Sequence, residues 1–138
     1  LVYTRTAAEQ NRSVRLGTTG KTLRKALLGT AALLAVAVLI PDSWYAWAFG
    51  FDGIQPVVQA LAPTALFGAV ASIVAHHLSG IGKHHWNAAT SGVGLITLLV
   101  LAREWVPGSG AVGAAWAASA AAAVQCTGLL FAWWRCER

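Results

Sequence analysis

Long apolar stretches, separated by short polar or glycine- and proline-bearing segments, dominate the chain after residue 22. The first stretch covers 23–40, and beyond its basic start it contains a single polar residue, Thr30. Pro41 follows, and a proline lacks the backbone donor that would continue a helix. A helix of about 18 residues is near the lower limit for crossing a hydrocarbon layer of ~30 Å. The pattern therefore predicts a first membrane span over 23–40.

Three more apolar stretches predict further helical spans over 55–77, 85–105 and 111–134. Pro63 falls inside the second of these and is expected to kink it, which neighbouring helices in a membrane can accommodate. Short glycine-bearing segments separate the stretches, and the segment 106–110 also contains a proline, which predicts a strong break. Short connections favour antiparallel neighbours, so we expect an all-α, up-down-up-down bundle of four transmembrane helices.

The segments outside the apolar stretches also have distinct patterns. Residues 1–20 form a polar, basic tail, part of which is compatible with a helix. Thr18 and Thr19 at its end are candidate N-cap residues for the first span. After Pro41 the sequence SWYAWAFGF predicts a short aromatic segment lying in the outer headgroup region, where amphipathic rings prefer to sit.

Composition agrees with a membrane location. Hydrophobic residues make up 57% of the 138-residue chain and charged residues 11%, whereas soluble domains average about 25% charged residues. A soluble domain of this size leaves much of its surface in water, so it could not hide this much apolar surface. The residues 21–138 are therefore predicted to form one transmembrane domain of an integral membrane protein.

The basic residues indicate the orientation. In the four-span arrangement the tail, the 78–84 turn and the C-terminus share one side of the membrane. That side holds Arg5, Arg12, Arg15, Lys21, Arg24, Lys25, Lys83, Arg135 and Arg138, and the other side holds Arg103. Basic residues concentrate on the cytoplasmic side of membrane proteins, so both termini are predicted to be cytoplasmic in a multi-pass protein of the cell membrane.

The same distribution indicates the partners. Basic residues at the ends of apolar stretches suit a bilayer with anionic headgroups. They do not form the basic patch expected of a nucleic-acid-binding protein, so no nucleic-acid partner is predicted.

Two histidine pairs flank the six-residue turn 78–83. An antiparallel helix pair would bring His76 and His77 close to His84 and His85. Neutral imidazoles are ligands for zinc, copper and nickel, so these four residues are candidate ligands for a divalent metal. They also suit a pH-sensitive position. The alternative interpretation is that they face headgroups or bond the last carbonyls of the second span.

A polar residue and several small residues lie within the predicted spans. Gln125 is the most polar of them, and its amide would either line a pore or bond a neighbouring helix. Small residues at a spacing of four let helix backbones approach closely, within one bundle or between copies. The candidate packing residues of this kind are Gly68, Ser72, Gly92, Ala118 and Ala122.

Catalytic chemistry is harder to find. Asp42, Asp52 and Glu104 all fall at the predicted outer edge, and no acidic residue is predicted to lie at membrane depth. A proton-coupled exporter would need a carboxylate at membrane depth. The sequence favours a self-associating protein without catalytic activity, such as a holin-like pore former or an accessory membrane subunit. The alternative is a transporter or binding protein for a metal or small solute that uses the four histidines.

Overall fold

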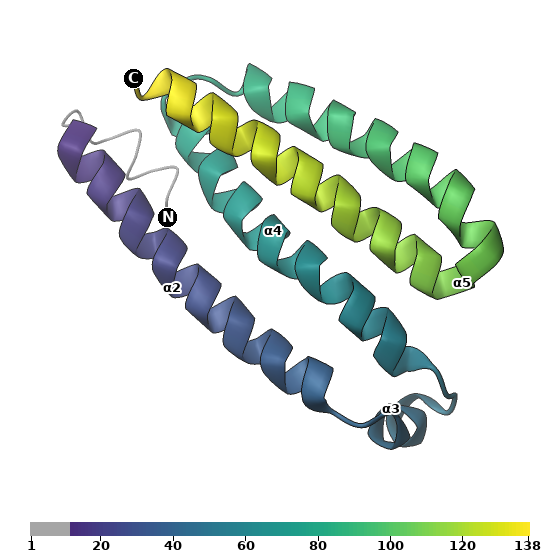
Figure 1. Cartoon of the computed structure of the whole chain (residues 1–138). Helices are drawn as coiled ribbons and strands as arrows, with labels where there is room; N and C mark the ends of the chain where they lie inside the picture. Colours follow the sequence, from purple (N-terminus) through teal and green to yellow (C-terminus); the bar gives the residue numbers. More distant parts are fainter. Residues whose placement is uncertain (1–11) are drawn as a thin grey trace.

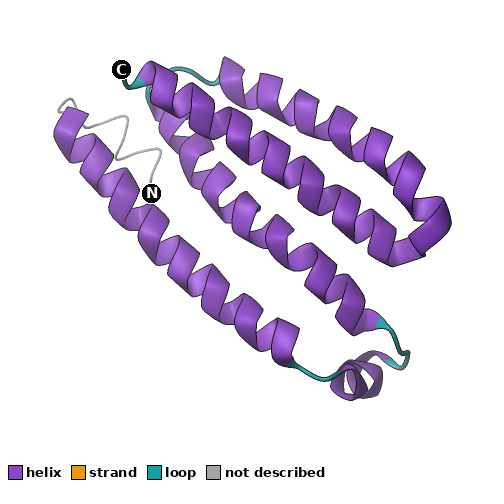
Figure 2. Cartoon of the chain, in the orientation of Figure 1, coloured by secondary structure: helices purple, strands orange, loops and turns teal. Residues whose placement is uncertain are grey.

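The computed structural model describes the backbone of residues 12–138 and the side chains of residues 17–138. Within that part of the chain all regular structure is helical (Figure 2). The helices are α2 (Arg12–Leu39), α3 (Asp42–Phe49), α4 (Ile54–Gly80) and α5 (His85–Cys136). Three of them, α2, α4 and α5, are long and apolar enough to cross a membrane. The predicted all-α fold is confirmed for the described residues.

The third and fourth predicted spans belong to one 52-residue helix, α5. A straight helix of that length would measure roughly 78 Å, far more than a hydrocarbon layer. Figure 1 shows that α5 instead folds back on itself, so that a first limb (85–109) and a second limb (111–136) lie side by side. The non-helical residue inside α5 is Gly110, with φ 55° and ψ −131°, a conformation that glycine adopts readily.

The break predicted over 106–110 is too wide. The helix continues through Pro107 and departs from helical geometry at Gly110 alone, because proline has a helical φ and only removes one donor. Close packing after the bend depends on a second glycine. A Cβ at Gly113 would collide with the backbone carbonyl of Trp105, so the two limbs can approach this closely only with glycine at that position.

The second limb of α5 carries most of the core. Its buried residues include Cys126, Leu129 and Ala132, which pack on a buried face of α4 that contains Ala71, Val74 and Leu78. Many of these are small, because two helices approach most closely where side chains are short. In Figure 1 the second limb lies between α4 and the first limb along much of its length.

Helix α2 lies beside this core. Among the described residues, the helix that it packs against is α4. Its apolar stretch has no buried residue within the chain. The helix also begins at Arg12, well before the expected start of the span. Thr18 and Thr19 therefore lie inside a helix, and the N-cap prediction is wrong. Arg5 lies outside the described residues.

At the other end of α2, the short helix α3 lies across the ends of the long helices and is seen end-on in Figure 1. The Tyr45 hydroxyl donates to the Ala37 carbonyl over 2.6 Å and fixes α3 on the end of α2. Trp44 and Trp47 are 67% and 87% exposed. The expected short aromatic segment is thus a helix that presents its indoles outward.

Candidate functional site

The most buried polar cluster joins three helices at one end of the molecule. His77, at the end of α4, is 0% exposed. Its Nδ1 lies 2.9 Å from the Thr19 hydroxyl on α2, and its Nε2 lies 2.8 Å from the Glu137 carboxylate just after α5. Thr19 and Glu137 are 1% and 9% exposed. We call these three residues the His77 joint.

The donors in the joint follow from the chemistry of each group. An ionised carboxylate only accepts, so Nε2 of His77 donates to Glu137. In a neutral ring Nδ1 is then the acceptor and the Thr19 hydroxyl donates to it. The indole of Trp133 packs edge-on against the imidazole, with ring centroids 5.8 Å apart. Both ring nitrogens of His77 therefore have a partner, and buried polar groups stabilise a fold when they are paired in this way.

A hydroxyl, an imidazole and a carboxylate in a row also resemble the groups of a nucleophilic triad. Such a triad needs a hydroxyl that a substrate can reach, whereas the Thr19 hydroxyl is buried and bonded to the ring. The geometry therefore holds α2, α4 and the end of α5 together and does not present a nucleophile.

The four predicted histidine ligands are not brought together. His77 is buried with both ring nitrogens engaged, so it has no lone pair free for a metal, while His76, His84 and His85 are exposed. Within the part of the chain that the structure describes, no group of three or more histidine, cysteine or acidic residues could hold a metal ion.

Sequence reasoning missed two members of the joint. Thr19 had been assigned to a helix start, and Glu137 had no role. The available signal was Glu137 itself, the one acidic residue after Glu104, placed between Arg135 and Arg138. A glutamate between two arginines, on the predicted membrane side that also contains the histidines, indicates a carboxylate that bonds to a basic side chain.

Gln125 forms an interhelical hydrogen bond. Its Nε2 donates to the Ser91 hydroxyl across the two limbs of α5 over 2.9 Å. Both residues line a groove of about 260 Å³ between α4 and α5, which we call the flank groove. The amide of Asn87 also lines it, and Nδ2 donates to the Ala75 carbonyl and to the Ser79 hydroxyl. Its Oδ1 is buried without a partner among the described residues.

The predicted packing residues occupy two kinds of position. Gly68 and Ser72 are exposed and line the flank groove, and Gly92 is also exposed. A Cβ added to Gly68 or Gly92 would meet nothing within 4 Å, so neither serves close packing inside the chain. Ala118 and Ala122 are half-buried and line a second groove beside Gln125.

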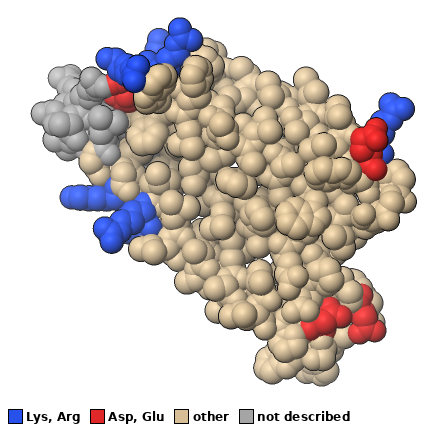
Figure 3. Space-filling model, in the orientation of Figure 1, with Lys and Arg blue, Asp and Glu red and all other residues tan. Residues whose placement is uncertain are grey.

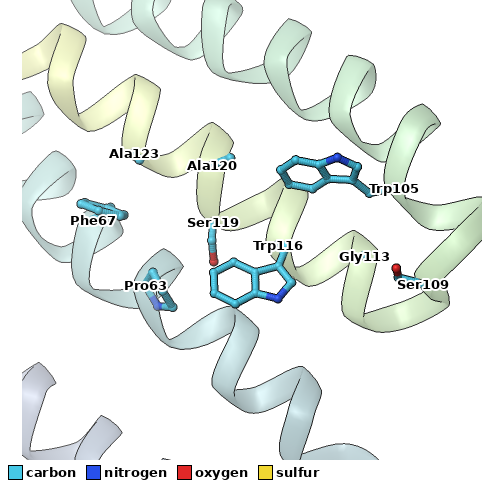
Figure 4. A pocket seen from close by; sticks show the side chains of 9 residues that line it. All are labelled: Pro63, Phe67, Trp105, Ser109, Gly113, Trp116, Ser119, Ala120 and Ala123. Carbon is cyan, nitrogen blue, oxygen red and sulfur yellow. The ribbon is translucent and has the colours of Figure 1, made fainter.

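An open cleft with a volume of about 540 Å³ lies at the bend of α5 (Figure 4). Pro63 and Phe67 reach it from α4, and Trp105 and Trp116 reach it from the two limbs of α5. The Ser119 hydroxyl at its wall donates to the Ala60 carbonyl over 2.5 Å and is 2.8 Å from the Thr64 hydroxyl. We call this space the bend cavity.

Charged side chains separate between the two ends of the molecule. In Figure 3 lysine and arginine gather mainly at the end where α2 begins and α5 finishes, with one acidic patch among them, and the other acidic residues lie near α3 and, beside a basic side chain, near the bend of α5. Arg103 and Glu104 are neighbours at the bend end. The two ends therefore present different electrostatic surfaces.

Asp42, at the other end of the molecule from Glu137, also has a defined role. Its two carboxylate oxygens accept from the backbone N–H groups of Gln55 and Gly53, each over 3.0 Å, at the start of α4. These bonds favour the charged form, so they lower the pKa of Asp42 below its ordinary value. The carboxylate caps α4 from a distance in sequence and ties α3 to it.

Comparison of the chain with protein-family models, with curated proteins and with solved structures finds no match. The proposed function therefore depends on the geometry and electrostatics described above.

Proposed function

We propose that this chain is a non-catalytic protein of the cell membrane that acts by packing against other copies of itself or against other membrane subunits. The observation that carries this proposal is the composition of the flank groove. Gly68 and Ser72 are exposed there, on the longest apolar stretch of α4, beside the Ser91 hydroxyl.

Exposed small and hydroxyl side chains at membrane depth favour a helical partner over lipid. Glycine leaves space that a second helix backbone can enter, and a hydroxyl can bond across a helix interface. Lipid tails offer neither a hydrogen bond nor a complementary surface. Large side chains at the exposed positions of the first limb, such as Leu95, Ile96 and Leu99, suit lipid contact instead.

The same proposal includes four crossings, with both termini on the cytoplasmic side. The four crossing segments would be α2, α4 and the two limbs of α5. Each of them is long enough to cross the hydrocarbon layer. The basic end of the molecule, which contains Lys21, Lys25 and Arg135, supports a cytoplasmic location for that end. A tag placed after Arg138 is expected to be reached by a membrane-impermeant reagent only in opened cells, and labelling in intact cells would overturn this orientation.

Self-association is tested best at Gly68. A Cβ added there meets no atom within 4 Å, so Gly68→Leu is expected to leave the fold intact while blocking close approach of a partner. Subunit counting in lipid nanodiscs is expected to show oligomers for the wild type and at least a tenfold loss for Gly68→Leu. Gly29→Leu is the matched control, since Gly29 also has open space, on α2. A wild type that stays monomeric at every protein-to-lipid ratio would contradict the proposal.

Pore formation and an accessory role differ in a measurable way. A holin-like pore former releases a trapped dye from vesicles when it oligomerises, and Gly68→Leu would reduce this release together with the oligomer. An accessory subunit would oligomerise without release. The dye experiment therefore separates the two forms of the proposed function.

A further inference from the structure

We propose that the bend cavity is a binding site for one acyl chain of a membrane phospholipid. The inference rests on the membrane location in the proposed function and not on self-association, so a monomeric protein would leave it intact. Three properties of the cavity lead to this ligand class: its lining, its size and its position.

The lining offers hydrocarbon and aromatic surface. Pro63, Phe67, Trp105 and Trp116 contribute most of the large side chains, with Ala120 and Ala123 between them. The Ser119 hydroxyl is already engaged by Ala60 and Thr64, so it is not offered to a ligand. A ligand that needs hydrogen bonds along its length would lose them on entry, because burial of an unpaired polar group is costly.

The size argues against an empty space. A volume of about 540 Å³ falls within the range typical of ligand pockets. Walls around an empty space forfeit the dispersion contacts that a guest would provide.

The position selects an acyl chain from among apolar guests. The cavity lies between α4 and α5, two helices with the length and composition of membrane spans, so lipid chains are the apolar molecules present at high concentration. Trp105 and Trp116 are 40% and 50% exposed at its bend end, and indoles favour the headgroup level. Arg103 is exposed at the same end of the first limb, where a guanidinium can bind the phosphate of the same lipid.

The test uses the full chain in vesicles of phosphatidylcholine that contain a small fraction of the same lipid with a photoreactive diazirine on one acyl chain. Cross-linked peptides are mapped by mass spectrometry. The second-limb peptide around Trp116 is expected to carry several-fold more label than the exposed apolar face of α2, which reports general lipid contact.

Ala123→Phe and Ala120→Phe fill the cavity from its wall and are expected to reduce labelling near Trp116 at least fivefold. Leu130→Phe is the matched control, because Leu130 is exposed on the same limb and does not line the cavity. Equal labelling of the cavity and α2 in the wild type would overturn the proposal even if a variant failed to fold. Strong cavity labelling that both filling variants leave unchanged would also overturn it.

Discussion

Helix α2 and the second limb of α5 are both apolar, yet they have opposite environments. The apolar stretch of α2 has no buried residue in the chain, whereas the second limb is buried on several sides by α4 and the first limb. The difference lies in side-chain size. Leucine and valine make up about half of the apolar stretch of α2, with exposed Leu28, Leu33 and Val36, while alanine is the commonest residue of the second limb. In this molecule small residues, and not hydrophobicity, mark the centre of the helix bundle.

The largest expected effect comes from enlarging a glycine in the second limb. A Cβ at Gly128 would lie 2.8 Å from Cγ2 of Thr90 on the first limb. Thr90 cannot easily turn away, because it is β-branched and its hydroxyl donates to the Trp86 carbonyl over 2.9 Å. Gly128→Leu is expected to lower the free energy of unfolding by about 3 kcal/mol, as overpacking of a core does. Equilibrium unfolding in mixed detergent micelles measures this loss of stability.

The matched substitution on α2 is Gly29→Leu, where an added side chain meets open space. Its expected effect on the free energy of unfolding is within about 0.5 kcal/mol, typical of surface substitutions. If Gly128→Leu and Gly29→Leu lowered the free energy of unfolding equally, the contrast between the second limb of α5 and α2 would be wrong.

The His77 joint links α2 and the end of the second limb, because Thr19 and Glu137 both bond to His77. His77→Ala removes a buried ring and both of its hydrogen bonds, to Thr19 and Glu137. We expect a loss of about 2 kcal/mol in unfolding free energy, as for other buried polar groups that lose their partner. Hydrogen exchange is expected to rise near Thr19 on α2 and less in the second limb near Ala117. Unchanged exchange around Thr19 would show that the joint does not anchor α2.

A smaller effect is expected at Ser119, which connects the second limb to α4. Ser119→Ala removes the hydrogen bond to the Ala60 carbonyl and leaves the small side chain that close packing needs. Interhelical bonds of this kind contribute about 0.6–2 kcal/mol in membranes, so a loss near 1 kcal/mol is expected. Thr127→Ala is a suitable control on the same limb, since that hydroxyl bonds within its own helix.

The smallest effect on stability is expected at Asp42, which caps the start of α4. Because folding lowers the pKa of Asp42, the stabilisation is complete above about pH 4 and is lost as the pH falls through the lower folded value. Asp42→Asn is expected to remove this acid dependence and to reduce the exchange protection of the Gln55 and Gly53 amides at neutral pH. Protection measured by nuclear magnetic resonance tests both points, and protection that is equal in the two proteins would exclude the cap.

The sequence predicts the helices well because long apolar stretches bounded by proline and glycine leave few alternatives. It does not predict where α2 begins, since polar residues such as Thr18 and Thr19 continue a helix beyond the apolar stretch. Helices that are apolar on all sides also carry no stripe that shows which face packs. The sequence marks Glu137 as a candidate for pairing but does not identify His77 as its partner, because the two residues are 60 positions apart and only the fold brings them together.

Gly110 has a consequence for biosynthesis. Glu137 can meet His77 only in a chain that has turned back at Gly110, since a straight α5 would carry the carboxylate about 40 Å beyond the bend. Thr19 and His77 leave the ribosome long before Glu137 does. The contact between His77 and Glu137 therefore forms only after the second limb has been synthesised and has folded back at Gly110.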